Sequence, residues 1–254
     1  MSESSPVGRL GLVSVLSCVL VSSACGTARE TKQSLGPSTD SMLVRHCRTI
    51  QASAVAFGIP TVTVGGVVAA EQTLNIGAID RVQDAVIRRL LKAKSSEWWT
   101  KWLVSNEALE GRFAKFRVIG NKWPERLVLT TYVGSIGPAQ LTPRTVLRAC
   151  RSVPTPTTHP CRGGVKEVLS TALDDDGALK LAAVVLAFEA LQWKRLYDED
   201  IRGDIGLLGS LYSAGGDYYR QRYGAKAGLH KYNPFGNWLS DHRNEIALAT
   251  ACNR

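Results

Sequence analysis

The sequence predicts a mainly α-helical domain, and three observations lead to this fold class. The chain has 254 residues, of which 44% are hydrophobic and 21% charged, which supplies enough apolar side chain for one packed core. In most segments the apolar residues recur at the three- and four-residue spacing of a helix face. No run of alternating apolar and polar residues and no internal repeat is present. We therefore expect helices packed on helices in one domain over residues 42–254.

The first 24 residues are typical of an export signal. Arg9 gives a positive start, and residues 10–21 form an apolar run of about 12 residues, which suits a signal core and is short for a membrane span. Small residues before Cys25 favour cleavage after Ala24, and Cys25 would then be the lipidated first residue of a lipoprotein. Plain secretion and an uncleaved anchor are the alternatives.

A polar stretch, residues 25–41, follows the signal and is rich in Ser, Thr, Gly, Pro and charged residues. This composition is typical of a flexible tether between a membrane anchor and a folded domain.

The folded part is expected to start with a helix over residues 42–57, which Gly58-Ile59-Pro60 would end. Residues 61–74 are ambiguous, because Thr-Val-Thr-Val favours a strand, whereas Val64, Val67, Val68 and Glu71 fall on one helical stripe. We choose a buried helix. Further helices are expected over 79–94, 96–116, 143–150 (with Thr142 as N-cap before Pro143), 166–173, 177–193, 204–214 and 237–252.

The cysteines suggest an oxidising compartment. Of six, Cys18 would leave with the signal and Cys25 would carry lipid, so that four remain. They would form two disulfides, Cys150 with Cys161 and Cys47 with Cys252; buried free thiols are the alternative. No pair has the spacing of zinc ligands and the four His are scattered, so neither a metal nor a cofactor is expected.

The formal net charge of +9 favours an anionic partner, which can be nucleic acid, a lipid surface or an acidic cell wall. No RNA- or DNA-binding motif accompanies the charge, so no nucleic-acid partner is expected.

Glu71 is the first candidate for chemistry. It follows five small or apolar residues, 66–70, at the end of the expected buried helix. A carboxyl group in such a place is partly desolvated, which raises its pKa and lets it hold a proton for a glycosidic oxygen. The alternative is a glutamate on the polar edge of a core helix.

A second candidate segment is Ser135-x-Gly137-x-x-Gln140-x-x-Pro143-x-Thr145. Gly137 lets the backbone approach a sugar, and the Gln140 amide offers both a donor and an acceptor. The alternative is a loop that leads into a capped helix.

These segments, followed by Leu211-Tyr212-Ser213-Ala214-Gly215, resemble in order the three active-site segments of the lysozyme-like lytic transglycosylases. The resemblance implies that Glu71 is the acid, that Tyr212 orients it, and that Ser135, Gly137, Gln140, Tyr212 and Ser213 bind substrate. Two residues depart from the family pattern, since Gln72 stands where Ser is usual and Ser213 where Asn is usual.

The interval from Glu71 to Ser135 is 64 residues, which is longer than is usual in the family. Glu125, ten residues before Ser135, is the rival acid.

The family implies a lysozyme-like helical fold with a central active-site cleft. It also implies cleavage of peptidoglycan glycan strands between N-acetylmuramic acid and N-acetylglucosamine, with 1,6-anhydro ends. The expected location is the periplasm, with a membrane anchor through lipid on Cys25. The alternatives are a non-catalytic peptidoglycan-binding lipoprotein on the same fold, a muramidase that uses water, and a helical interaction protein of the envelope.

Overall fold

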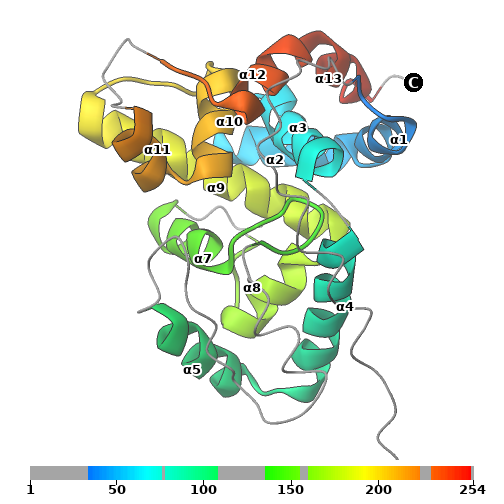
Figure 1. The fold of residues 1–254 in the computed structure, drawn as a ribbon, viewed down its shortest axis with the longest axis vertical. Helices are drawn as coiled ribbons and strands as arrows, with labels where there is room; N and C mark the ends of the chain where they lie inside the picture. Colours follow the sequence, from blue (N-terminus) through cyan, green and yellow to red (C-terminus); the bar gives the residue numbers. More distant parts are fainter. Residues whose placement is uncertain (1–33, 76–77, 108–134, 155–159, 224–229, 253–254) are drawn as a thin grey trace, which may run out of the picture. The chain divides into compact units, whose positions relative to one another are not determined.

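The structure is a computed structural model and describes residues 34–75, 78–107, 135–154, 160–223 and 230–252. Within these ranges it has twelve α-helices and one π-helical segment, and no β-sheet (Figure 1). The mainly α-helical class expected from the sequence is therefore confirmed. The predicted signal peptide, Cys25 and most of the predicted tether lie outside the described residues.

The N-terminal helices are α1 (Pro37–Arg45) and α2 (Cys47–Phe57). The first begins inside the stretch expected to be a tether, and the single helix expected over 42–57 is two helices that meet at His46. The His46 Nδ1 lies 2.8 Å from the Asp176 Oδ1, which belongs to a helix 130 residues further along the chain. The junction residue thus contacts a residue that is distant in the sequence, and no local sequence pattern predicts this contact.

The helix α3 (Thr61–Ala70) continues directly into the π-helical segment η1 (Glu71–Asn75). All residues from Thr63 to Ala70 are buried. The ambiguous segment is thus the buried helix that the stripe of valines predicts, because burial of both glycines and valines against neighbouring helices outweighs their low helix propensity.

Four helices follow: α4 (Ala78–Ala93), α5 (Ser96–Glu107), α7 (Pro143–Ser152) and α8 (Val165–Ala172). The part of the expected helix 96–116 beyond Glu107 lies outside the described residues. Thr142 precedes α7 with extended backbone as expected, but its side chain makes no capping hydrogen bond.

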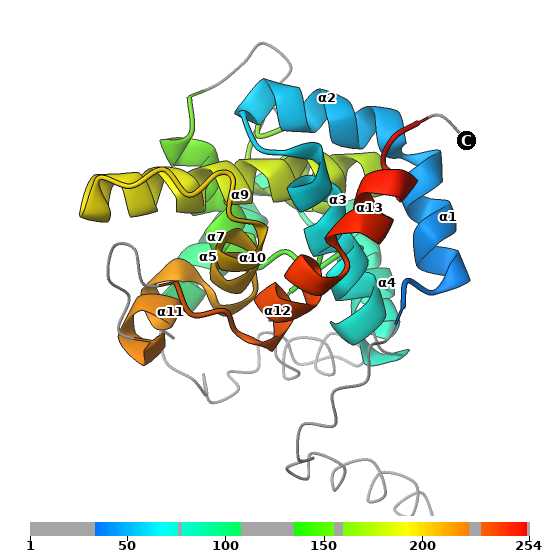
Figure 2. The ribbon, with the colours of Figure 1, turned by 90° about the horizontal axis from the view of Figure 1, so that it is seen from above.

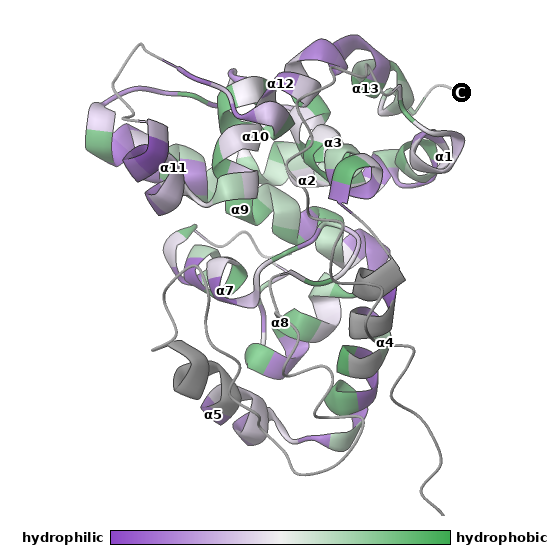
Figure 3. Ribbon diagram, in the orientation of Figure 1, coloured by the Kyte–Doolittle hydropathy of each residue, from purple (hydrophilic) through white to green (hydrophobic). Residues whose placement is uncertain are grey.

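The longest described helix is α9 (Asp175–Tyr197), with 23 residues. Its side chains are mostly apolar and buried, and it packs against α2, α3, α7, α8 and α10 (Figures 1 and 2). Figure 3 shows apolar residues along α9 and α10, whereas hydrophilic residues dominate α11. The helix α9 is therefore the element around which the core is built.

The C-terminal part consists of α10 (Ile205–Ala214), α11 (Gly216–Tyr223), α12 (Pro234–Asp241) and α13 (Arg243–Ala249). The single helix expected over 237–252 is wrong, because the chain turns at His242. The Nδ1 of His242 lies 2.8 Å from the carbonyl oxygen of Trp238, so that its side chain contacts the end of α12 as α13 begins.

His230 is held between two carboxylates at the loop before α12. Its Nδ1 lies 2.6 Å from the Asp204 Oδ2, and its Nε2 lies 3.1 Å from the Glu199 Oε1. Burial lowers the pKa of His230, but the hydrogen bonds to the two carboxylates outweigh it and raise the pKa above its usual value.

Two disulfides close the chain on itself, Cys47–Cys252 and Cys150–Cys161, with Cα–Cα distances of 5.4 and 5.5 Å. Both are the pairs expected from the sequence. Disulfides are typical of chains that fold outside the cytosol. In the described ranges, no helix combines the length and the apolar character needed to cross a bilayer.

Candidate functional site

Glu71 lies at the point where α3 passes into the π-helical segment, and it is 4% exposed. The small and apolar residues before it let α3 pack closely on α2, α9, α10 and α13, which carries the carboxyl group to the end of a buried helix. The Asn75 side chain donates a hydrogen bond of 2.6 Å from its Nδ2 to the Glu71 Oε2. The carboxyl group is thus buried and oriented by a neighbour one turn away.

The segment from Ser135 to Leu141 is a tight turn closed by an antiparallel bridge between Ile136 and Leu141. Ser135 Oγ donates to the Gln140 Oε1 at 2.6 Å, and the Gln140 Nε2 donates to the Gly137 carbonyl at 3.1 Å. The Gln140 amide therefore shapes its own turn. A sugar that binds Ser135 or Gln140 has to add to these hydrogen bonds or replace them.

Gly137 is required by this turn for two reasons. Its φ is +71°, in the left-handed region that favours glycine. A Cβ at this position would lie 1.8 Å from the Ala172 carbonyl oxygen, so any side chain would collide with the backbone at the end of α8. The Gly137 N–H donates a hydrogen bond of 3.0 Å to the Asp84 Oδ1. This bond attaches the turn to α4.

Two side chains tie the turn to the other segments. Gln72, next to the candidate acid, donates from its Nε2 to the Pro138 carbonyl at 2.8 Å. Tyr212, on α10, donates from its hydroxyl to the Ala139 carbonyl at 2.5 Å. Burial raises the pKa of the Tyr212 hydroxyl, and the negative charge of Glu71 raises it further, which places this ring near the carboxyl group. Segments that begin at Glu71, Ser135 and Leu211 therefore meet in space.

The resemblance implies that Tyr212 orients the Glu71 carboxyl group. The Tyr212 hydroxyl donates a hydrogen bond to the backbone of the turn, and the charge of Glu71 acts on this hydroxyl. In this geometry Tyr212 positions the turn against the candidate acid.

Ser213 is exposed on α10, and its Oγ accepts a hydrogen bond of 2.8 Å from the Asn233 Nδ2. Asn233 also caps α12 by accepting from the Gly236 N–H. The sequence did not single out Asn233 as a site residue, although Asn before Pro234 is a recognisable helix start.

The rival acid Glu125 lies outside the described residues. Among the described side chains, no group of three or more His, Cys, Asp or Glu is arranged to hold a metal ion.

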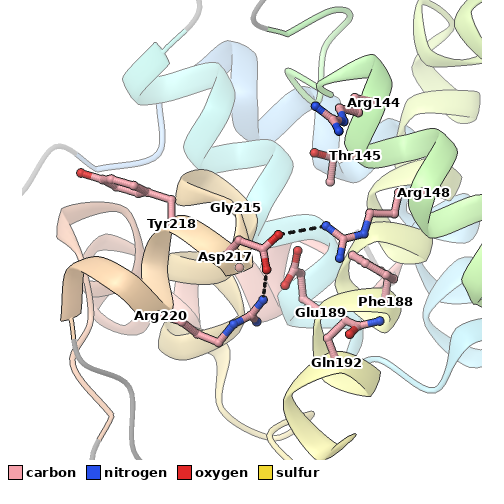
Figure 4. Close-up of a pocket in the computed structure, with 11 residues that line it drawn as sticks. Arg144, Thr145, Arg148, Phe188, Glu189, Gln192, Gly215, Asp217, Tyr218 and Arg220 are labelled. Atoms are coloured by element: carbon pink, nitrogen blue, oxygen red, sulfur yellow. Dashed lines mark hydrogen bonds and ion pairs between the residues drawn. The ribbon is translucent and has the colours of Figure 1, made fainter. Parts of the chain in front are cut away.

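A second charged site, not expected from the sequence, lies between α7, α9 and α11 (Figure 4). Glu189 of α9 is 4% exposed there, and burial raises its pKa to about 7 against the opposing charges of Arg220 and Arg148. The sequence does contain an indication of this site, because Glu189 is the only charged residue from 181 to 193. Its partners lie on other helices and were not visible in the sequence.

Comparisons of the chain with models of protein families, with curated proteins and with solved structures found no match. The resemblance to lytic transglycosylases therefore rests on the residues of the three segments themselves.

Proposed function

We propose that this protein cleaves the glycan strands of peptidoglycan by a lytic transglycosylase reaction, with Glu71 as its acid and base. One observation carries the proposal. Three segments that resemble the family's active-site segments, and are far apart in the chain, meet around one buried carboxyl group.

In the proposed reaction, Glu71 gives its proton to the glycosidic oxygen between N-acetylmuramic acid and N-acetylglucosamine. The bond from that oxygen to C1 of the muramic sugar breaks, and C1 takes on oxocarbenium character. The Glu71 carboxylate then removes the proton of the muramic 6-hydroxyl, whose oxygen bonds to C1 and closes a 1,6-anhydro ring. No water is consumed, and Glu71 is protonated again for the next cycle.

The other predicted site residues would line the path of the glycan. In this proposal the turn at Ser135, Gly137 and Gln140 would present backbone and amide groups to the glycan, with Tyr212 and Ser213 contributing from α10. The net charge of +9 would hold the protein on an anionic wall. A lysozyme-like arrangement with a central cleft, and a periplasmic lipoprotein anchored through Cys25, belong to the same proposal.

Digestion of purified peptidoglycan by the domain from Gly26 onward tests the proposal, with the released fragments identified by mass spectrometry. The wild type is expected to give anhydro-muramyl ends, and Glu71→Gln is expected to give none. Glu125→Gln is the matched variant, because it makes the same chemical change at the rival acid and should leave the products unchanged.

The other outcomes assign the other functions. Reducing ends would make the protein a muramidase. If neither the wild type nor the variant releases fragments, and both sediment with the wall, the protein is a binding module and the proposed reaction is wrong. Products that vanish in Glu125→Gln and persist in Glu71→Gln would move the acid to Glu125.

A further inference from the structure

The pocket between α7, α9 and α11 has a volume of about 170 Å³, and five charged residues line it. Three arginines and two acids line it: Arg144 and Arg148 from α7, Glu189 from α9, and Asp217 and Arg220 from α11. Figure 4 shows Arg148 and Arg220 on opposite sides of Asp217, with Glu189 beside them.

Asp217 holds the two guanidinium groups in place. It accepts a hydrogen bond of 3.0 Å from the Arg148 Nη1 and another from the Arg220 Nη2. The hydrogen bond from Arg148 lowers the pKa of Asp217, and the one from Arg220 adds to the effect, so Asp217 stays ionised at neutral pH. Each guanidinium group keeps further N–H donors that this carboxylate does not use.

One of those donors lacks an acceptor. The Arg220 Nη1 is buried and has no hydrogen-bond partner among the described residues. A buried donor without an acceptor is unfavourable, and in native proteins such a group usually meets a water or a ligand. The floor of the pocket is therefore short of one hydrogen-bond acceptor.

Gly216 keeps this floor open. A Cβ on Gly216 would lie 2.1 Å from the Glu189 Oε2 and 2.9 Å from the Arg220 Nη1. A carboxyl oxygen and a guanidinium nitrogen therefore both approach the same side of Gly216, and any larger residue would push them apart.

The charges decide which ligand fits. The groups that face Glu189 are Arg148 of α7 and Arg220 and Asp217 of α11. With Arg144 also on the rim, cations outnumber acids, so an ammonium group is disfavoured. A carboxylate can accept from the guanidinium groups, and a protonated Glu189 can donate its hydroxyl to the second carboxylate oxygen. The volume is below the range of about 300–1,000 Å³ for whole small molecules, so the pocket suits one substituent of a larger ligand.

We propose that this pocket is a subsite for a carboxylate group of the ligand, held by Arg148 and Arg220 with Glu189 as a further donor. The carboxylate subsite is inferred from the positions of Arg148, Arg220 and Glu189 alone. The identity of the larger ligand rests on the proposed function, according to which the carboxylate is one that peptidoglycan carries, on the lactyl group of a muramic acid without its peptide or on the peptide itself.

Titration of two sugars into the ¹⁵N-labelled protein tests this. N-acetylmuramic acid carries a lactyl carboxylate, and N-acetylglucosamine is the same sugar without it. We expect saturable shifts of the Gly216 and Asp217 amide signals with N-acetylmuramic acid and none with N-acetylglucosamine. Equal shifts with both sugars would overturn the role of the carboxylate.

Acetate separates the pocket from the proposed function, because it contains the carboxylate alone. Saturable shifts at Gly216 with acetate support the subsite, and their absence together with no response to N-acetylmuramic acid overturns it. A response to acetate without one to N-acetylmuramic acid would overturn the assignment to the lactyl group and assign the pocket to a carboxylate of the peptide. None of these titrations involves cleavage, so they remain readable if the protein proves to have no transglycosylase activity.

Two arginines of α11 provide a matched pair of variants. Arg220→Gln is expected to weaken the binding of N-acetylmuramic acid about tenfold or more, as expected for a lost charge-assisted hydrogen bond. Arg222→Gln makes the same change at an exposed position of the same helix and is expected to leave the affinity unchanged. Equal losses in the two variants would contradict the subsite and indicate general attraction of an anion to a basic surface. Unfolding curves of both variants check that they fold.

The pH dependence gives a second readout. Because the pKa of Glu189 is about 7, its protonated fraction falls about tenfold between pH 6 and pH 8, and the affinity should fall by a similar factor. Glu189→Gln keeps a donor that does not titrate, so its affinity should stay constant over this range. A wild type whose affinity is independent of pH would remove Glu189 from the subsite.

Discussion

Replacing the buried Glu189 by Gln is expected to stabilise the protein above neutral pH, and to leave its stability nearly unchanged in acid. Burial raises the pKa of this carboxyl group from 4.5 to about 7 in the folded protein. The folded protein therefore holds a proton that the unfolded chain has already lost at intermediate pH. The stabilisation from this proton is complete below pH 4.5, and it is lost as the pH rises through 7.

The size of the effect follows from the same values. A difference of about 2.5 pKa units corresponds to about 3 kcal/mol between acid and alkaline conditions. Gln has nearly the same shape as a protonated glutamic acid and can accept the hydrogen bond that the Gly216 N–H gives to Glu189. The variant should escape the cost of a buried ionised carboxylate, and should be more stable than the wild type by about 3 kcal/mol at pH 8.

Urea unfolding followed by tryptophan fluorescence, at pH 5 and pH 8, measures this difference. Glu97→Gln is the control, because the Glu97 side chain is 76% exposed and its replacement should not change how stability depends on pH. If the free energies of unfolding of wild type and Glu189→Gln stay parallel between the two pH values, burial does not govern the protonation of Glu189. The protonation step in the carboxylate subsite would then lose its physical basis.

Four further changes are expected to alter stability, each checked by denaturant unfolding. Removing the Cys47–Cys252 disulfide, which spans 205 residues, should lower the free energy of unfolding by about 5 kcal/mol. Removing the Cys150–Cys161 disulfide, which spans 11 residues, should lower it by about 3 kcal/mol. Equal losses would contradict an origin in loop entropy. Gly137→Ala should cost about 3 kcal/mol or more, since its Cβ meets a backbone carbonyl at 1.8 Å and φ is positive; a variant as stable as the wild type would show that the turn relaxes freely. His230→Asn should lower stability most at pH 5–6, with the difference shrinking as the pH rises through the raised pKa of His230; a difference that grows with pH would reverse the assignment.

The periodicity of apolar residues was enough to predict where helices form. It did not predict where one helix ends and the next begins. The stripes of valines and leucines locate α3, α4 and α10 within a few residues. The chain turns at His46 and His242 without glycine or proline. At His46 the imidazole contacts an aspartate 130 residues away, and pairings of that kind leave no trace in a local pattern.

The site shows the same division. The order of the segments around Glu71, Ser135 and Tyr212 was enough to predict candidates, and the structure brings these segments together. The hydrogen-bond partners of these residues could not be predicted from the sequence. The Tyr212 hydroxyl donates to a carbonyl group of the turn, and the position of that group depends on the folded turn. The pocket at Glu189 was missed for the same reason, as its charges come from three helices.

The two departures from the transglycosylase pattern each coincide with a contact that explains the residue present. The Gln72 side chain reaches the Pro138 carbonyl, 66 residues further along the chain, and a serine is too short to make this bond. Position 72 therefore holds the turn that is joined to the segment of Glu71.

At position 213 the residue present is smaller than the usual one, whereas at position 72 it is larger. Serine is shorter than the asparagine usual in the family, and Asn233 brings an amide group to it from the start of α12 at 2.8 Å. An amide therefore lies beside the exposed end of α10 even though the sequence has none at that position. Under the proposed function, Gln72 and Asn233 would supply contacts at the two positions where this sequence departs from the family's pattern.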